Sequence, residues 1–244
     1  MKKKIKILYE DDDVLAIDKP AGIAVHDDAD GNQKYTIVDW ILENYPKMKK
    51  VYEDSEEEGS NISRPGIVHR LDKDTSGVLL LAKNIRAYRF LKKQFKDKTI
   101  KKVYRAIIYG DLKKDVGIID RPIGRSKDEF RSRATGSLAR GEMREAITYY
   151  RVVERFKDYS LLELRPRTGR THQLRVHLKS VSHPIVCDAV YAKGQPCLPG
   201  LKRHALHAFS VEFKLPSDQG GKEIKVESPL PADFKKALVN LRPL

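Results

Sequence analysis

The sequence predicts an α+β fold built from many short strands and a few helices. Runs in which apolar and polar residues alternate recur along the chain, whereas helical spacing is confined to a few segments. Hydrophobic residues make up 40% of the 244 residues, which is enough to bury a substantial core. We therefore expect a mixed, mainly antiparallel central sheet with flanking helices. No clear linker divides the chain, so residues 1–244 are expected to form one domain, with a two-lobed arrangement as the alternative.

The first quarter of the chain predicts two strands, a helix and a loop. The strands are expected at residues 5–8 and 14–18, and the Lys19-Pro20-Ala21-Gly22 turn ends the second of them. A helix is expected over residues 36–45, with Thr36 as its N-cap. Residues 46–63 carry five acidic side chains and no apolar pattern, so they predict an exposed loop.

The rest of the chain predicts further strands between three helices. Residues 78–82 form a continuous apolar run that is typical of a buried strand. Residues 115–143 contain glycines and many arginines and predict irregular loops around short strands. The other expected elements are a helix over 84–97, a strand over 101–109, a hairpin of 145–156 with 159–165, a helix over 171–180, strands over 206–215 and 223–227, and a helix over 231–241.

The charge balance favours a polyanionic partner. Lys and Arg total 48 against 34 Asp and Glu, which gives a net charge of +14. RNA or DNA is therefore the first candidate partner, and the alternative is that the excess charge only aids solubility. No apolar run approaches 18 residues and the N-terminus does not resemble a signal peptide, so we expect a cytoplasmic protein with no membrane partner. The two cysteines, Cys187 and Cys197, predict neither a zinc site nor a disulfide framework.

Residues 64–77, R-P-G-I-V-H-R-L-D-K-D-T-S-G, are the most informative part of the sequence. Asp72 stands between basic and turn-forming residues, with His69 and Arg70 before it and Lys73 after it. A carboxylate kept ionised by neighbouring cations can act as a nucleophile or an electrostatic anchor. The alternative for a single aspartate is an ordinary turn residue.

Two more segments carry possible chemistry. Tyr104 lies in the basic strand K-V-Y-R-A, where it could stack on a nucleobase or pack in the core. Residues 165–178 read R-P-R-T-G-R-T-H-Q-L-R-V-H-L, and their T-G-R-T turn leads into a helix start that could hold phosphate oxygens. A solvent-facing basic helix is the alternative. His172 and His177 are five residues apart and lie on different helical faces, so they predict no metal site.

These segments, in this order, resemble the motifs of the RluA-type pseudouridine synthases, whose signatures include H-R-L-D-x-x-T-S-G and R-T-G-R-T-H-Q-L-R-V-H. V-L-A-I-D-K-P-A-G-I-A-V-H from residue 14 and R-H-A-L-H-A from residue 203 resemble further family segments, for which we expect structural roles. The resemblance implies the pseudouridine synthase fold with a catalytic cleft. It makes Asp72 the catalytic aspartate, places Tyr104 against the target base, pairs Arg175 with the aspartate, and inserts Arg70 where the flipped base was. RNA contacts are expected from Arg70, His69, Arg170, Thr171, His172 and Gln173.

The implied reaction isomerises a uridine in structured RNA to pseudouridine and consumes nothing, so we expect no cofactor and no metal. The expected partner is RNA, with large-subunit ribosomal RNA as the first candidate and tRNA as the alternative, and the expected state is a monomer. The rival from another class is a non-catalytic RNA-binding protein on the same scaffold. A zinc deaminase is set aside because its H-x-E and P-C-x-x-C signature is absent.

Overall fold

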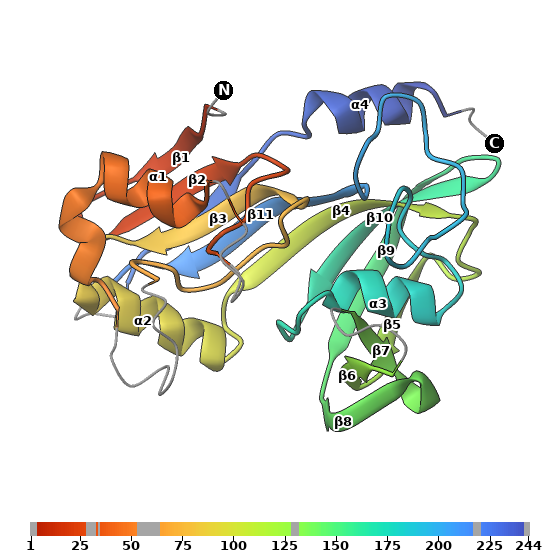
Figure 1. The fold of residues 1–244 in the computed structure, drawn as a ribbon, viewed down its shortest axis with the longest axis horizontal. Coiled ribbons are helices and arrows are strands. Elements are labelled where there is room, and N and C mark those ends of the chain that lie inside the picture. Colours follow the sequence, from red (N-terminus) through yellow and green to blue (C-terminus); the bar gives the residue numbers. More distant parts are fainter. Residues whose placement is uncertain are drawn as a thin grey trace. The chain divides into compact units, whose positions relative to one another are not determined.

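The computed structural model describes residues 4–27, 33, 35–52, 64–127, 132–216 and 221–241. They form two compact units, whose elements are labelled in Figure 1. Unit 1 comprises Met1–Lys101 with Ser210–Ser228, and unit 2 comprises Lys102–Phe209 with Pro229–Leu244. Within the described ranges no helix is long and apolar enough to cross a membrane.

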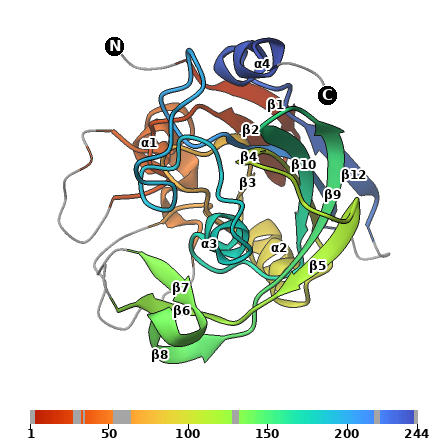
Figure 2. The ribbon, with the colours of Figure 1, turned by 90° about the vertical axis from the view of Figure 1, so that its right-hand side faces the viewer.

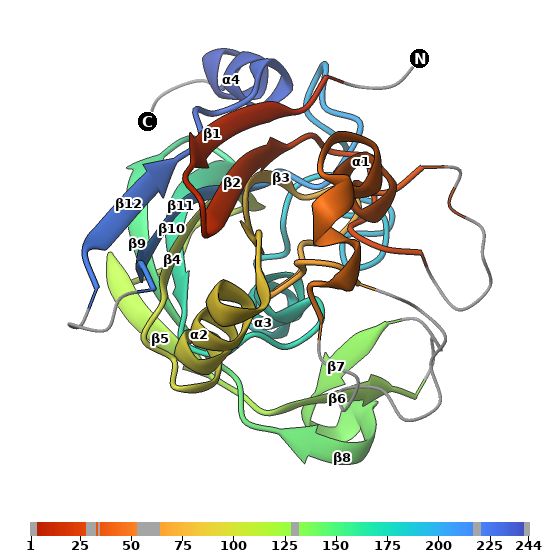
Figure 3. The same cartoon turned by 90° about the vertical axis from the view of Figure 1, so that its left-hand side faces the viewer.

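Unit 1 is built on an antiparallel sheet that Figure 3 shows side on. β2 pairs with β3 in a register that runs from Val14↔Ala82 to Lys19↔Gly77. All seven residues of β3 are buried, which explains why this strand reads as one apolar run instead of an alternating pattern. The strands are β1 (Lys6–Glu10), β2 (Val14–Lys19), β3 (Ser76–Ala82), the second half of β11 (Leu206–Lys214) and β12 (Glu223–Glu227).

The α-helices α1 and α2 of unit 1 each begin after a side-chain N-cap, and the sequence predicts Thr36 as the first of these caps. Thr36 precedes α1 (Ile37–Asn44), and its side chain accepts the Asp39 N–H at 3.2 Å while the Asp39 carboxylate accepts the Thr36 N–H at 2.8 Å. Asn84 precedes α2 (Ile85–Lys96) and accepts the Ala87 N–H at 2.9 Å. A short 3-10 helix, η1 (Pro46–Lys50), begins the segment predicted as an exposed loop, and residues 53–63 of that segment lie outside the described residues.

Unit 2 contains a curved antiparallel sheet and two helices. α3 contacts β10 and lies on the inner side of this sheet in Figure 2. Leu162 and Leu164 of the sheet, Leu174 and Leu178 of α3 and Phe234 of α4 belong to one buried core. The elements, in sheet order, are β4 (Lys101–Tyr109), β10 (Tyr159–Pro166), β9 (Ile147–Arg155) and β5 (Val116–Asp120), with α3 (Gln173–Ser180) and α4 (Ala232–Val239).

A small second sheet occupies the arginine-rich segment of unit 2. β6 (Ile123–Ser126) is its central strand, with β7 (Arg133–Thr135) on one side and β8 (Ala139–Arg144) on the other. A 3-10 turn, η3 (Gly136–Leu138), joins β7 to β8. The short strands confirm the prediction for this segment, although more of it is regular sheet than its composition indicates.

Two further details differ from the sequence predictions. Helix α3 begins at Gln173 and not at residue 171, because His172 adopts a left-handed conformation with φ of 56°. Cys187 and Cys197 form a disulfide, with Cα atoms 4.9 Å apart, although their spacing predicted none. The chain returns on itself over residues 188–196, which spacing alone does not reveal.

Candidate functional site

Asp72 lies in a tight turn that leads into the buried strand β3. Its carbonyl accepts the Thr75 N–H at 3.1 Å, and Leu71 and Thr75 are buried on either side of it. The Asp72 side chain is half-buried. The turn therefore anchors the backbone of Asp72 through buried neighbours while its side chain keeps access to solvent.

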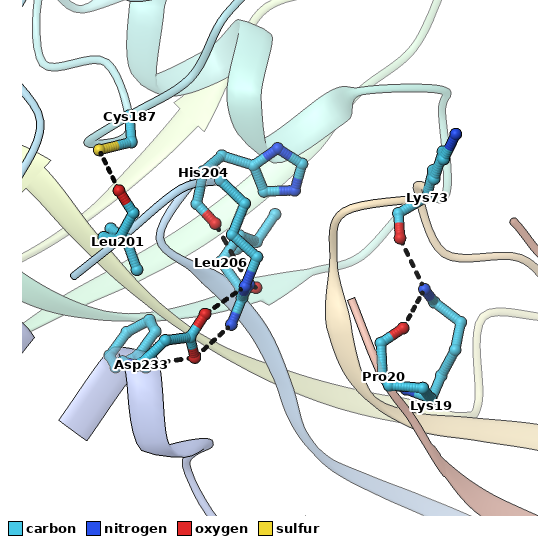
Figure 4. A network of polar contacts seen from close by, with 10 residues as sticks. Lys19, Pro20, Lys73, Cys187, Leu201, His204, Leu206 and Asp233 are labelled. Carbon is cyan, nitrogen blue, oxygen red and sulfur yellow. Dashed lines mark hydrogen bonds and ion pairs between the residues drawn. The ribbon is translucent and has the colours of Figure 1, made fainter. Parts of the chain in front are cut away.

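Lys19, in the family-like segment that begins at residue 14, fixes the turn that contains Asp72. Its side chain is 0% exposed, and its Nζ donates to the carbonyls of Pro20 at 3.1 Å and Lys73 at 2.9 Å (Figure 4). The same Nζ donates to the Ile23 carbonyl at 2.9 Å. The Gly22 N–H also donates to the Lys73 carbonyl at 2.9 Å. A buried ammonium needs such oxygen partners, so the lysine fixes the residue that follows Asp72. Sequence reasoning assigned this segment only a general structural role.

The segment before Asp72 is also fixed to β3. The Leu80 N–H donates to His69 Nε2 at 2.9 Å, and the His69 ring stacks on Phe95 with centroids 4.7 Å apart. This geometry gives His69 a role in positioning the turn, and its predicted RNA contact stays a prediction. Arg70, which the resemblance makes the inserted residue, is exposed.

Tyr104 lies on β4 in unit 2, opposite Leu164 of β10. It is half-buried and packs against the core of unit 2. Lys102 precedes it by two residues and so lies on the same face of the strand. Lys102 Nζ donates to the Thr168 carbonyl at 3.4 Å, and burial lowers the pKa of Lys102 to about 8. The strand therefore links Tyr104 to the turn that precedes α3.

Gln173 organises that turn. Its Oε1 accepts from Thr168 Oγ1 at 2.7 Å and from the Arg170 N–H at 3.0 Å. Its Nε2 donates to the Ile147 carbonyl at 3.0 Å and to Thr148 Oγ1 at 3.1 Å. These four bonds use the whole amide, so the geometry gives Gln173 a structural role, and its RNA contact stays a prediction. Arg170 is half-buried and Thr171 is exposed at the same turn.

Arg175 is 6% exposed and forms a two-pronged ion pair with Asp188. Arg175 Nε lies 2.7 Å from Asp188 Oδ2, and Nη2 lies 2.8 Å from Oδ1. The guanidinium carbon of Arg175 lies 5.0 Å from the ring centroid of Tyr191. The Tyr191 hydroxyl lies 2.9 Å from His172 Nδ1. The arginine lowers the pKa of Asp188 against the opposing effect of burial. Asp188 and Tyr191 are parts of this site that no motif in the sequence analysis pointed to.

His177 is fully buried and both of its ring nitrogens have partners. Nε2 lies 2.9 Å from the Arg121 carbonyl, which can only accept, so Nδ1 accepts from Thr148 Oγ1 at 2.9 Å. Burial lowers the pKa of His177. His172 and His177 therefore serve separate hydrogen-bond networks, and the described part of the chain contains no group of three potential metal ligands.

The predicted catalytic residues are divided between the two units. Asp72 belongs to unit 1, whereas Tyr104 and Arg175 belong to unit 2. The pairing of Arg175 with Asp72 stays a prediction, as do the catalytic role of Tyr104 and the RNA contacts.

The family model and the curated relatives that match this chain all describe RNA pseudouridine synthases. A family model described as RNA pseudouridylate synthase matches residues 13–180. The chain is 40% identical over 246 residues to a ribosomal large subunit pseudouridine synthase D of Nitrosomonas europaea, covering 98% of this chain and 66% of the relative. It is 37% identical over 238 residues to the uncharacterised RNA pseudouridine synthase YlyB of Bacillus subtilis, covering 98% of this chain and 73% of that one. The chain thus spans about two thirds of the length of these curated relatives.

Solved structures agree with this assignment. The structure named Human RNA Pseudouridylate Synthase Domain Containing 1 superposes on this chain with a TM-score of 0.74 and 25% sequence identity. The match covers 99% of this chain and 89% of the human chain. The chain therefore has the pseudouridine synthase fold, a mainly antiparallel sheet with four helices in the described residues. Its fold, its motifs and its relatives together place it in the RluA family of RNA pseudouridine synthases, which are isomerases.

Proposed function

We propose that this protein isomerises a specific uridine of large-subunit ribosomal RNA to pseudouridine, with Asp72 as the catalytic aspartate. The observation that carries the choice of RNA is the similarity to relatives named ribosomal large subunit pseudouridine synthase D, at 40% and 42% identity in Nitrosomonas europaea and Borreliella burgdorferi. A tRNA uridine is the alternative substrate.

The fixed turn around Asp72 supports a catalytic role for its carboxylate. Three backbone carbonyls hold buried Lys19, one of them from Lys73, so the carboxylate is presented by a turn with little freedom. Positioning a reacting group in this way lowers the entropic part of a reaction barrier. We further propose that Arg175 orients the carboxylate of Asp72, that Tyr104 stacks on the uracil, and that Arg70 fills the space of the flipped base.

The substrate is tested by mapping pseudouridines with carbodiimide and reverse transcription in cells with and without the gene. Loss of one or a few sites in large-subunit ribosomal RNA is expected, and return of those sites with the wild-type gene but not with Asp72→Asn would tie them to this enzyme. Loss of tRNA sites alone would replace the ribosomal assignment. Unchanged maps, together with no pseudouridine formed by the purified protein on either RNA, would contradict the proposal and favour a non-catalytic RNA-binding protein.

A further inference from the structure

Three arginines stand side by side across the small sheet of unit 2. In the register of β6 with β7, Arg125 lies opposite Arg133, and in its register with β8, Arg125 lies opposite Arg140. Directly opposed residues of antiparallel strands point to the same face with Cβ atoms about 5 Å apart. The three side chains, Arg133, Arg125 and Arg140, therefore form one row across β7, β6 and β8, which we call the arginine row.

The described part of the chain supplies no acidic partner for the arginine row. Among the residues that the structure describes, no ion pair joins an acidic side chain to Arg125, Arg133 or Arg140. The acidic residue nearest in β8, Glu142, is paired with Arg144 at 2.9 Å. Arg125 and Arg140 are exposed and Arg133 is half-exposed.

Opposed like charges are destabilising in a sheet, so the row costs folding stability. A cost of this kind is characteristic of residues kept for a ligand. Several other arginines of unit 2 are paired with carboxylates: Arg155, for example, lies 2.9 Å from Asp111 and 2.7 Å from Asp115. The arginine row differs from these paired residues.

The row has a defined place beside the candidate site. Ile123, two residues before Arg125 on the same strand face, is buried in a cluster with Val176 of α3 and Tyr191. The Arg133 N–H donates to the Tyr191 hydroxyl at 2.9 Å, and the same hydroxyl contacts His172. Packing and hydrogen bonding thus fix the small sheet to the segment that holds Arg175.

We propose that the arginine row is a binding site for the phosphate backbone of the substrate RNA. This inference rests on the proposed function, because it takes RNA to be the polyanion. Neighbouring strands lie about 4.8 Å apart, so the row spans about 10 Å. In a DNA duplex each strand carries one phosphate per about 3.4 Å of helix axis. The row can therefore meet at least two phosphates. It presents guanidinium groups, which bind phosphate oxygens and so position a nucleic acid.

The test compares the salt dependence of RNA binding in Arg125→Gln, Arg140→Gln and their double variant with that of Arg155→Gln. Arg155 is the matched control, because it is an arginine of the same unit whose charge is already paired. The probe is a fluorescein-labelled RNA hairpin with uridines in its loop, titrated between about 50 and about 200 mM KCl. Each row variant should reduce the slope of log K against log salt by about 0.7–0.9, and Arg155→Gln should leave the slope unchanged.

Two more measurements separate binding from folding and chemistry. Arg125→Lys keeps the charge and should restore the slope, and Arg125→Gln should melt no lower than wild type, because it removes a repulsion. Row variants with the wild-type slope, or a control that loses as much slope as they do, would overturn the inference. The wild-type protein could bind the hairpin with a steeper salt slope than the row variants and yet form no pseudouridine in any RNA. That result would contradict the proposed function but still support the arginine row as an RNA-binding site.

Discussion

Asp72 is the residue on which the chemistry depends, so its substitution is the first prediction. Asp72→Asn keeps the size of the side chain but removes its charge and nucleophilicity. Isomerisation should fall by more than about a thousandfold, while RNA affinity and thermal stability stay near those of wild type. Tritium release from RNA labelled at the fifth position of uracil measures the rate. A variant that still turns over at a comparable rate would exclude Asp72 as the catalytic aspartate.

Arg175 and Asp188 form a buried pair whose members need one another. Asp188→Asn removes the negative charge that Nε and Nη2 of buried Arg175 contact, which should reduce the free energy of unfolding by about 3–5 kcal/mol. The double variant Arg175→Met with Asp188→Asn should recover part of that loss. The control is Asp233→Asn, which breaks the similar pair with Arg203, where Arg203 Nε lies 2.7 Å from Asp233 Oδ2.

Asp233 is the more exposed carboxylate of the two, at 33% against 0% for the side chain of Asp188, so its loss should cost less. Urea unfolding of the three variants and the wild type gives these free energies. Equal losses for Asp188→Asn and Asp233→Asn would show that burial of the Arg175 pair does not matter.

Lys102 should make stability depend on alkaline pH. Burial lowers its pKa from 10.5 to about 8 in the folded protein, so between these values the unfolded chain binds the proton and the folded protein does not. The contribution of Lys102 to the free energy of unfolding therefore rises from about pH 8 to about pH 10.5. The test is the free energy of unfolding in urea at pH 7.5 and 9.5. Lys102→Met should remove the rise in this free energy that Lys102 contributes between the two pH values.

The neighbouring Lys101 is the control for this pH effect. Ion pairs with Glu223 and Glu212 raise the pKa of Lys101, so its contribution has the opposite sign and is lost as the pH rises. Lys101→Met should therefore leave the Lys102 effect in place. Parallel pH curves for wild type and Lys102→Met would contradict the prediction.

Among the elements, the segment leading to Asp72 depends on Gly66. Gly66 has a φ of +69°, and a Cβ there would lie 2.4 Å from Met48 Cε and 2.6 Å from the Ala82 carbonyl oxygen. Gly66→Ala should therefore cost about 2–4 kcal/mol, from strain in φ and from the clash. Gly136 also has a positive φ, of +57°, but no atom lies within 4 Å of the added Cβ. Gly136→Ala should cost only about 1–2 kcal/mol in the same urea experiment.

Local signals predicted most elements because each depends on nearby residues. The caps Thr36 and Asn84 and the apolar run of β3 specify their elements by short-range bonds and burial. The start of α3 was placed too early, because His172 has a left-handed φ and its ring contacts Tyr191, 19 residues away, which the local sequence does not reveal. Asp188 carries no motif of its own in the sequence, and only the folded loop brings it to Arg175. The positions of Asp72, Tyr104 and Arg175 were predicted through family resemblance and not from spacing.

At the scale of the whole molecule, the chain passes between the two units more than once. Each unit contains two segments of the sequence, and β11 begins in unit 2 and ends in unit 1. We therefore expect both units to unfold in one transition. Trp40, the single tryptophan, lies in unit 1, so its fluorescence reports on that unit. Asp188→Asn, in unit 2, should shift the Trp40 transition in urea as far as it shifts the circular dichroism transition. A Trp40 transition that stays at the wild-type midpoint would show that the units unfold separately.

The same interleaving sets an order of events during synthesis. Residues up to 101 leave the ribosome first, but the part of their sheet that lies in 210–228 is made only after the whole of 102–209. At about 5–20 residues per second, the wait is roughly 5–20 seconds. For that time the apolar strand β3 has no β11 beside it, and an uncovered apolar strand edge can pair with other chains. The nascent protein thus passes through a period in which chaperone protection matters more than it does for the finished enzyme.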